Sequence, residues 1–343
     1  MPEFPIVLLA LYMYTDGCHE ASIDVPSLKV SVVICCHTME RIDDLRLSIK
    51  AAIGQTFASC EVVVAVDHNQ ELLDALQAGL PSSMKVVPNT GVKGLSDTRN
   101  AGIAASSGNV IVFFDDDAVA EPDCVNMLVQ QYRVRSVAGV GGRSVPAWES
   151  GRPSWFPEEL DWIVGSTYKG APEVVSQVNR LIGCNMSFRR EVFDTVGMFS
   201  TELGRVGTAG EGEDSEICMR VRHQMPGTVL LYEPRAVVHH KVPHHRSTFR
   251  YLLSRSYSGG VSVASISRMY ADSEASPEST ATERGYLSYI LTAAVPSRFK
   301  RLYRPASIAQ LVAIGASVLA TGLGFLVGMV RGSAGSPDAN PEC

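Results

Sequence analysis

The sequence predicts an α/β fold with a mostly parallel central sheet and helices on both faces. First, short apolar runs alternate with segments of helical periodicity between residues 28 and 143. Second, these runs are apolar almost throughout, which is typical of strands buried on both faces of a parallel sheet. Third, acidic and other polar residues follow the carboxyl ends of the runs, where ligands bind in such sheets. We therefore expect a binding site at that edge of the sheet.

The elements are expected in a regular order along the chain. Strands are predicted at residues 28–36, 61–67, 84–89, 109–117 and 136–143. Helices are predicted at residues 41–55, 70–80, 96–108 and 122–134. Apolar residues at helical spacing support the first helix, Ser96 opens the third as its N-cap, and Pro122 stands in the first turn of the fourth.

The pattern changes after residue 143. Residues 143–180 are rich in proline and hold all three tryptophans, and a long loop of this kind is more often functional than idle. Order returns in residues 181–193, in a helix at 210–225 and in a strand at 227–240. Residues 249–270 are predicted to form a helix that breaks at Gly259–Gly260.

Composition divides the chain into five segments. These are an N-terminal extension (1–27), an α/β domain (28–270), a linker with a membrane-surface segment (271–304), a transmembrane helix (305–331) and a short tail (332–343). The transmembrane prediction rests on residues 306–330, which contain no charge and can cross a hydrocarbon core of about 30 Å. A buried core helix is the alternative, but it would normally carry a polar stripe. Because more basic residues precede this segment than follow it, we expect a single-pass protein of the cell membrane with a cytoplasmic α/β domain.

Charge and cysteine usage narrow the class of protein. The net charge is −6, so nothing favours a general affinity for nucleic acid. The eight cysteines contain no CxxC pair and lie mostly in apolar runs. We expect them to be reduced core residues in a cytosolic environment rather than a disulfide scaffold.

Three consecutive carboxylates follow the apolar run that ends at residue 114. Asp115 and Asp117 are two residues apart, so on an extended strand end they point to one side while Asp116 points to the other. Two carboxylates that face the same point repel each other and require a cation, and oxygen ligands of this kind suit Mg²⁺ or Mn²⁺. A solvated acidic turn is the alternative for the triplet taken alone.

Other polar residues near predicted strand or helix ends each allow more than one interpretation. Asp67 is either a turn residue or an acceptor for a nucleobase or ribose. Arg99 either holds a phosphate or pairs with an acidic neighbour. Glu213 and Asp214 begin a helix, where carboxylates are stable caps, but Asp214 could also act as a general base. One of the four histidines of "HHKVPHH" could complete the Asp115/Asp117 site; zinc binding or a surface cluster are the alternatives.

Together these motifs resemble family 2 glycosyltransferases, which have the nucleotide-sugar-binding GT-A fold. The resemblance spans residues 29–270 and rests on five motifs in the family's order: "VSVVICCHT", "VVVAVDHN", "GLSDTRNAGIAASSGNVIVFFDDD", "IGCNMSFRREVFDTVGMF" and "GEDSEICMR". The first departs from the family at Cys35–Thr38, and after Asp67 the second departs as well. The later stretch "YEPRAVVHHKVPHHRSTFRYLLSRSYSGGVS" is similar to a subgroup of glucosyl-dolichyl-phosphate glucuronosyltransferases.

The resemblance assigns roles to particular residues. It implies that the nucleotide sugar is bound by Asp67, Arg99, Asp115, Asp116 and Asn185. It implies that Mn²⁺ or Mg²⁺ is held by Asp115, Asp117 and His240. It implies that the catalytic residues are Asp214, as the base, and Glu213.

The implied activity is a metal-dependent, inverting sugar transfer. The donor would be a nucleoside-diphosphate sugar, most often UDP-linked in this family. The acceptor would be a hydroxyl group of a membrane-associated, polyprenyl-phosphate-linked glycan in polysaccharide or glycoconjugate synthesis. Two alternatives remain at this point: a nucleotidyltransferase-like enzyme, which the lack of a glycine-rich phosphate loop disfavours, and a non-catalytic, membrane-anchored binding protein.

Overall fold

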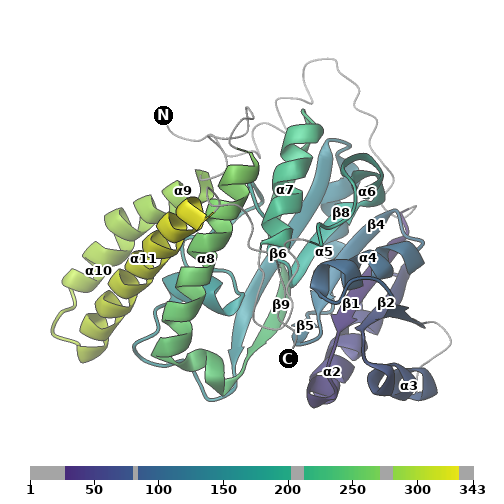
Figure 1. The fold of residues 1–343 in the computed structure, drawn as a ribbon, viewed down its shortest axis with the longest axis horizontal. Helices are drawn as coiled ribbons and strands as arrows, with labels where there is room; N and C mark the ends of the chain where they lie inside the picture. Colours follow the sequence, from purple (N-terminus) through teal and green to yellow (C-terminus); the bar gives the residue numbers. More distant parts are fainter. Residues whose placement is uncertain (1–27, 80–83, 202–211, 271–280, 332–343) are drawn as a thin grey trace. The chain divides into compact units, whose positions relative to one another are not determined.

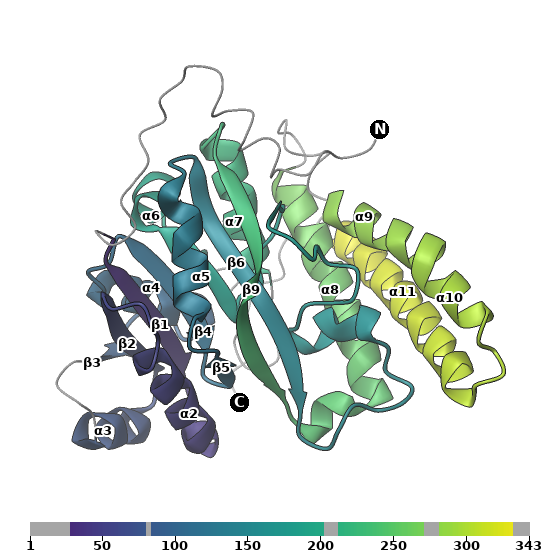
Figure 2. The same ribbon diagram turned by 180° about the vertical axis from the view of Figure 1, so that it is seen from behind.

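The computed structural model describes residues 28–79, 84–201, 212–270 and 281–331 (Figures 1 and 2). The predicted N-terminal extension, the C-terminal tail and part of the 271–304 linker lie outside these residues. The described chain forms two compact units. The first contains residues 28–149 and 164–242, and the second contains residues 150–163 and 243–331. Residues 243–270 thus pack with the C-terminal helices.

The first unit is built on a nine-stranded sheet with the order β3-β2-β1-β4-β8-β6-β9-β5, and β7 pairs with β9. The strands are β1 (Val30–Cys36), β2 (Cys60–Asp67), β3 (Met84–Asn89), β4 (Val110–Asp115), β5 (Ala118–Ala120), β6 (Val137–Trp148), β7 (Ser176–Gln177), β8 (Asn185–Arg189) and β9 (Val229–Val242). The predicted parallel arrangement is confirmed for β3-β2-β1-β4. Beyond β4 the sheet is mixed, because β8 runs antiparallel to both β4 and β6.

Helices cover both faces of this sheet, as predicted. They are α2 (Ile42–Ile53), α3 (Gln70–Gly79), α4 (Leu95–Ala105), α5 (Cys124–Gln130), α6 (Arg190–Val196) and α7 (Glu213–Gln224). Side chains of β1 alternate between two buried clusters, with Val32 and Ile34 in one and Val33 in the other. The first cluster receives α2, α3 and α5, and the second receives α4, α6 and α7 (Figures 1 and 2). Burial on both faces explains why these strands are apolar at nearly every position.

The second unit is helical. It contains η5 (His244–Ser247), α8 (Phe249–Met269), α9 (Ala281–Tyr289), a π-helical turn (Ile290–Ala294), α10 (Val295–Phe299), α11 (Pro305–Arg331) and most of η4 (Glu158–Val164). The predicted break at Gly259–Gly260 is wrong, because α8 is continuous. A Cβ added at Gly260 would lie 2.0 Å from the carbonyl oxygen of Thr321 in α11. This glycine therefore permits close helix packing rather than interrupting the helix.

Helix α11 has two different faces. Gly324 and Gly328 are buried against α8, where an added Cβ at Gly324 would meet the carbonyl oxygen of Tyr257 at 2.0 Å. The opposite face is exposed and apolar, with members at helical spacing: Ile308, Val312, Leu319, Leu323, Leu326 and Val330. In the part of the chain that the structure describes, α11 is the one helix long and apolar enough to cross a membrane.

Candidate active site

The strand order brings the acidic triplet beside a histidine. Residue Asp115 ends β4, and the chain turns through Asp116 and Asp117 into β5. Ala118, the first residue of β5, pairs with His240 of β9. Because β9 lies far from β4 in sequence, only the sheet topology places His240 next to Asp117.

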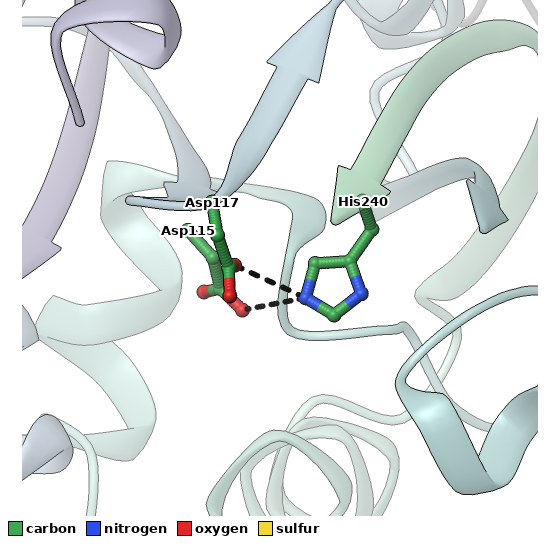
Figure 3. Close-up of side chains that lie close together, drawn as sticks. All are labelled: Asp115, Asp117 and His240. Atoms are coloured by element: carbon green, nitrogen blue, oxygen red, sulfur yellow. Dashed lines mark ion pairs between the residues drawn. The ribbon is translucent and has the colours of Figure 1, made fainter. Parts of the chain in front are cut away.

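Asp115, Asp117 and His240 form one cluster (Figure 3). One ligand atom from each lies within 4.8 Å of the others. Nε2 of His240 is 3.1 Å from Oδ1 of Asp117 and 4.0 Å from Oδ2 of Asp115. Asp117 and His240 are buried, while Asp115 is partly exposed. The cluster thus has two well-enclosed members and one that solvent can reach.

The alternation of β9 decides between the two adjacent histidines. His240 points into the cluster, whereas Nε2 of the exposed His239 lies 3.0 Å from Oε1 of Glu121. Nδ1 of His240 is buried and has no hydrogen-bond partner among the described residues. Two carboxylates and an imidazole nitrogen are a donor set that a divalent cation accepts. This acidic cluster could therefore hold a metal ion.

Gly165 packs directly against the His240 ring. Its φ angle is +76°, and an added Cβ would lie 2.9 Å from Cε1 of His240. Its carbonyl oxygen accepts hydrogen bonds from the Ser144 hydroxyl at 3.2 Å and the Cys184 thiol at 3.5 Å. The sequence pattern did not single out this glycine, since neither its backbone conformation nor its neighbour is visible in the sequence.

Arg41 is a second site residue that the sequence analysis missed. It ends η2 (Met39–Arg41), just after β1, and β1 pairs with β4 so that Cys35 lies opposite Asp115. Its Nη1 is 3.1 Å from Oδ1 of Asp116 and 3.0 Å from Oδ2 of Asp117. Burial lowers the pKa of this guanidinium, but the neighbouring aspartates raise it by more, so the pKa lies above its usual value.

Arg99 forms an ion pair, which was one of its two predicted roles. The side chain is buried, with Nη1 2.8 Å from Oε1 of Glu213 and Nη2 3.6 Å from Oδ1 of Asp115. Its guanidinium also lies 6.0 Å from the ring centroid of Phe113 and 5.4 Å from that of Phe199. Burial lowers the pKa of Arg99, but Glu213 and Asp115 outweigh it and leave the pKa above its usual value.

Glu213 and Asp214 begin α7 after Gly212, whose φ of +104° is the left-handed conformation that glycine tolerates. Burial raises the pKa of Glu213 above its usual range, although Arg99 opposes the shift. Asp214 is only partly buried; its Oδ2 accepts a hydrogen bond from the Gly183 N–H at 3.1 Å, and its Oδ1 accepts one from Ser215 N–H at 2.7 Å. Of the two carboxylates, Asp214 is thus the one that a substrate can approach.

Asp67 lies at the end of β2, where it was expected, and already accepts several hydrogen bonds. Its Oδ1 accepts from Nδ2 of Asn89 at 3.1 Å and lies 2.9 Å from Nδ1 of His68, and its Oδ2 accepts from Gly94 N–H at 3.1 Å. The carboxylate therefore holds the loop between β3 and α4 in place. Its role toward a nucleobase stays a prediction.

Asn185 is fully buried, and its side chain is used by the protein itself. The amide nitrogen donates to the carbonyl oxygens of Ala236 at 2.9 Å and Arg143 at 3.2 Å, and the amide oxygen accepts from the Cys124 thiol at 3.7 Å. These contacts join β8 to β6 and β9. The geometry supports a structural role for Asn185 more than the expected contact with a nucleotide sugar.

Comparisons with known proteins identify the family of the chain. The sequence model of glycosyl transferase family 2 matches residues 31–197 of the chain. The chain is 33% identical over 310 residues to a glucosyl-dolichyl phosphate glucuronosyltransferase of Haloferax volcanii, covering 88% of this chain and 97% of that protein. It is 25% identical over 244 residues to the succinoglycan biosynthesis protein ExoM of Rhizobium meliloti, covering 68% of this chain and 74% of the relative.

A solved structure shows the same fold. The mannosyltransferase PcManGT from Pyrobaculum calidifontis, in complex with GDP-Man and Mn²⁺, superimposes with a TM-score of 0.53 at 15% identity, covering 95% of this chain and 86% of that chain. At this identity the likeness concerns the fold alone, which is the GT-A fold. The relative that matches nearly end to end, together with the family match over residues 31–197, carries the assignment: the chain is a glycosyltransferase and belongs to glycosyl transferase family 2.

Proposed function

We propose that this glycosyltransferase moves a sugar from a nucleoside-diphosphate donor, UDP-linked by preference, to a hydroxyl group of a polyprenyl-phosphate-linked acceptor, with inversion and with the help of Mn²⁺ or Mg²⁺. The observation that carries the proposal is the cluster of Asp115, Asp117 and His240 at the carboxyl ends of the strands. The acceptor class is inferred from the Haloferax relative, a glucosyl-dolichyl phosphate glucuronosyltransferase.

Asp115, Asp117 and His240 would hold the divalent cation. When bound, that ion stabilises the negative charge that develops on the leaving diphosphate. Asp67 would accept a hydrogen bond from the nucleobase, with Asp116 near the ribose. Arg99 would stabilise the site, because its buried guanidinium forms ion pairs with both Asp115 and Glu213.

Asp214 would act as the general base. Hydrogen bonds from Gly183 N–H and Ser215 N–H hold its carboxylate in place. The carboxylate takes the proton of the acceptor hydroxyl as the hydroxyl oxygen attacks the anomeric carbon. The bond to the diphosphate breaks on the opposite side, so a single displacement inverts the configuration without a protein nucleophile.

The dolichyl-phosphate relative and α11 suggest a membrane protein. We propose that α11 spans the cell membrane once and that the catalytic unit lies on the cytoplasmic side. The exposed apolar face of α11 suits lipid, and exposed Arg301 and Arg304 just before it suit a cytoplasmic interface. An acceptor on a lipid phosphate would then be presented at the same surface as the enzyme.

Release of nucleoside diphosphate from a panel of nucleotide sugars, measured with and without Mn²⁺, tests the proposal. We expect release that depends on the metal and is lost in Asp117→Ala. Asp43→Ala is the matched control, because Asp43 is an exposed carboxylate on α2. If calorimetry detects no nucleotide binding by the wild-type protein in the presence of Mn²⁺, the proposed donor site is wrong.

A further inference from the structure

Arg41 contacts two of the three consecutive carboxylates with one nitrogen. Its Nη1 lies 3.1 Å from Oδ1 of Asp116 and 3.0 Å from Oδ2 of Asp117. Both carboxylates are almost completely buried, with side chains 5% and 6% exposed, whereas the Arg41 side chain is 29% exposed. The guanidinium thus lies at the boundary between the buried acidic cluster and solvent.

Asp117 divides its two oxygens between different partners. Oδ1 lies 3.1 Å from Nε2 of His240, on the side of the predicted metal site, and Oδ2 lies 3.0 Å from Nη1 of Arg41. Arg41 therefore compensates the charge of Asp117 through the oxygen that His240 does not contact. Arg41 and His240 can therefore contact Asp117 at the same time.

Arg41 has donors beyond those used by the aspartates. A guanidinium has five N–H groups in a planar fork. Two Nη1 contacts go to Asp116 and Asp117, and Nη2 lies 3.3 Å from Nδ1 of His37. Among the described residues the guanidinium makes no further hydrogen bond or ion pair, and its partial exposure leaves it accessible to a ligand. A fork of this geometry pairs well with phosphate oxygens.

Arg99, which also lies beside the acidic cluster, is more deeply buried than Arg41. Its side chain is 3% exposed and is held by Glu213 and by the rings of Phe113 and Phe199. It is therefore less able than Arg41 to meet an incoming anion.

We propose that Arg41 is a donor-binding residue that contacts the diphosphate of the nucleotide sugar while it neutralises Asp116 and Asp117. This inference rests on the proposed function. The diphosphate brings negative charge close to the carboxylates of Asp115, Asp116 and Asp117. A divalent cation would have to offset the repulsion between the diphosphate and these carboxylates alone, unless a second cation also faces the diphosphate. Arg41 supplies that second cation from η2, which follows β1, the strand that lies beside β4.

Calorimetric titration of purified, full-length protein tests this role in two steps: Mn²⁺ alone, and then UDP and GDP in saturating Mn²⁺. In Arg41→Gln we expect Mn²⁺ to bind at least as tightly as in the wild type, because a positive charge next to Asp117 is removed. We expect nucleotide affinity in Mn²⁺ to fall about ten- to a hundredfold. Arg41→Lys keeps the charge but loses the planar fork, so its nucleotide affinity should lie between those of the wild type and Arg41→Gln.

Arg46→Gln is the matched control, because Arg46 is an exposed arginine on the adjoining helix that pairs only at the surface with Asp43. It should bind both ligands like the wild type. A parallel loss of Mn²⁺ and nucleotide affinity in Arg41→Gln would show that Arg41 merely maintains the carboxylates, and unchanged nucleotide affinity would remove any role in donor binding. If Arg41→Gln does not fold, Arg41→Lys decides by the same criteria. A wild-type protein that binds neither nucleotide would instead overturn the proposed function.

Discussion

Nη1 of Arg99 lies 2.8 Å from Oε1 of Glu213, although 114 residues separate them in the chain. The pair joins α4 to the first turn of α7, and Nη2 of the same arginine lies 3.6 Å from Asp115. One buried guanidinium thus connects the acidic end of β4 with the helix that carries the proposed base. The relation between these two parts of the site depends on this ion pair.

Removing one partner of the Arg99–Glu213 ion pair should lower the stability of the protein. In Arg99→Met, Glu213 would remain buried without its counter-ion, and we expect the free energy of unfolding to fall by about 3–5 kcal/mol. The double variant Arg99→Met/Glu213→Leu should recover a large part of that loss, since no buried charge is left uncompensated. Urea unfolding followed by fluorescence measures both variants. Equal stability of Arg99→Met and the wild type would contradict the buried ion pair.

Asp214→Asn should separate chemistry from donor binding. The amide keeps the size of the side chain but cannot accept the acceptor's proton, so we expect the rate of sugar transfer to fall by about 10²–10⁴. Nucleotide affinity in Mn²⁺ should stay within about twofold of wild type. Asp194→Asn, at an exposed position of α6, is the control and should be fully active. Transfer that survives in Asp214→Asn would mean that another group is the base.

Gly165→Ala should weaken metal binding through the His240 ring. An added Cβ would lie 2.9 Å from Cε1, so the ring must shift relative to Asp115 and Asp117. Gly151→Ala is a matched control, because Gly151 also has a φ of +76° but no atom lies within 4 Å of an added Cβ. Both variants should lose about 1–2 kcal/mol of stability from the positive φ.

Only Gly165→Ala should show a weaker Mn²⁺ affinity in calorimetry or electron paramagnetic resonance. A similar loss in Gly151→Ala would attribute the effect to general destabilisation, and an unchanged affinity in Gly165→Ala would argue that His240 does not bind the ion.

Glu61 predicts a dependence of stability on acid pH. Burial opposes its ionisation, but hydrogen bonds from Ser31 and Ser107 and the ion pair with Lys85 lower the pKa from 4.5 to about 2. A carboxyl whose pKa is lower in the folded state stabilises the protein above its unfolded pKa, and that stability disappears as pH falls toward the folded pKa. The contribution should therefore be complete above about pH 5 and be lost between about pH 5 and pH 2.

Urea unfolding of Glu61→Gln across this range measures the contribution. The difference in stability from the wild type should shrink as the pH falls. Glu71→Gln, at an exposed position of α3, should follow the wild-type pH profile. A constant difference between Glu61→Gln and the wild type from pH 3 to pH 6 would contradict the lowered pKa.

The contact between α8 and α11 predicts a contrast between two glycines of α11. In Gly324→Val, the new side chain would collide with the backbone of Tyr257, so the helices must separate. In Gly322→Val no atom lies within 4 Å of the added Cβ. We expect the first substitution to lower the melting temperature in detergent by several degrees and the second to leave it nearly unchanged. Equal melting temperatures would show that the two helices do not pack closely.

The sequence by itself determined much of the fold and part of the candidate site. Local hydrophobic periodicity predicted the alternating strands and helices from β1 to α5, apart from the short strand β5, because strands buried on both faces are apolar throughout and amphipathic helices are not. The carboxylates of Asp67 and Asp115 were expected at strand ends, since chain order alone places them there. The exposed apolar face of α11 also follows from composition over a long segment.

Only the tertiary structure decided which of these groups meet. The choice of His240 over His239 depends on the register of β9 against β5, and the contacts of Arg41 depend on β1 lying beside β4. Gly260 was misread as a break because the sequence does not show that α11 packs against it. Periodicity is a property of neighbouring residues, whereas strand order, register and helix packing are set by contacts between residues far apart. The partners within the site therefore emerge only when the sheet and the helices are assembled.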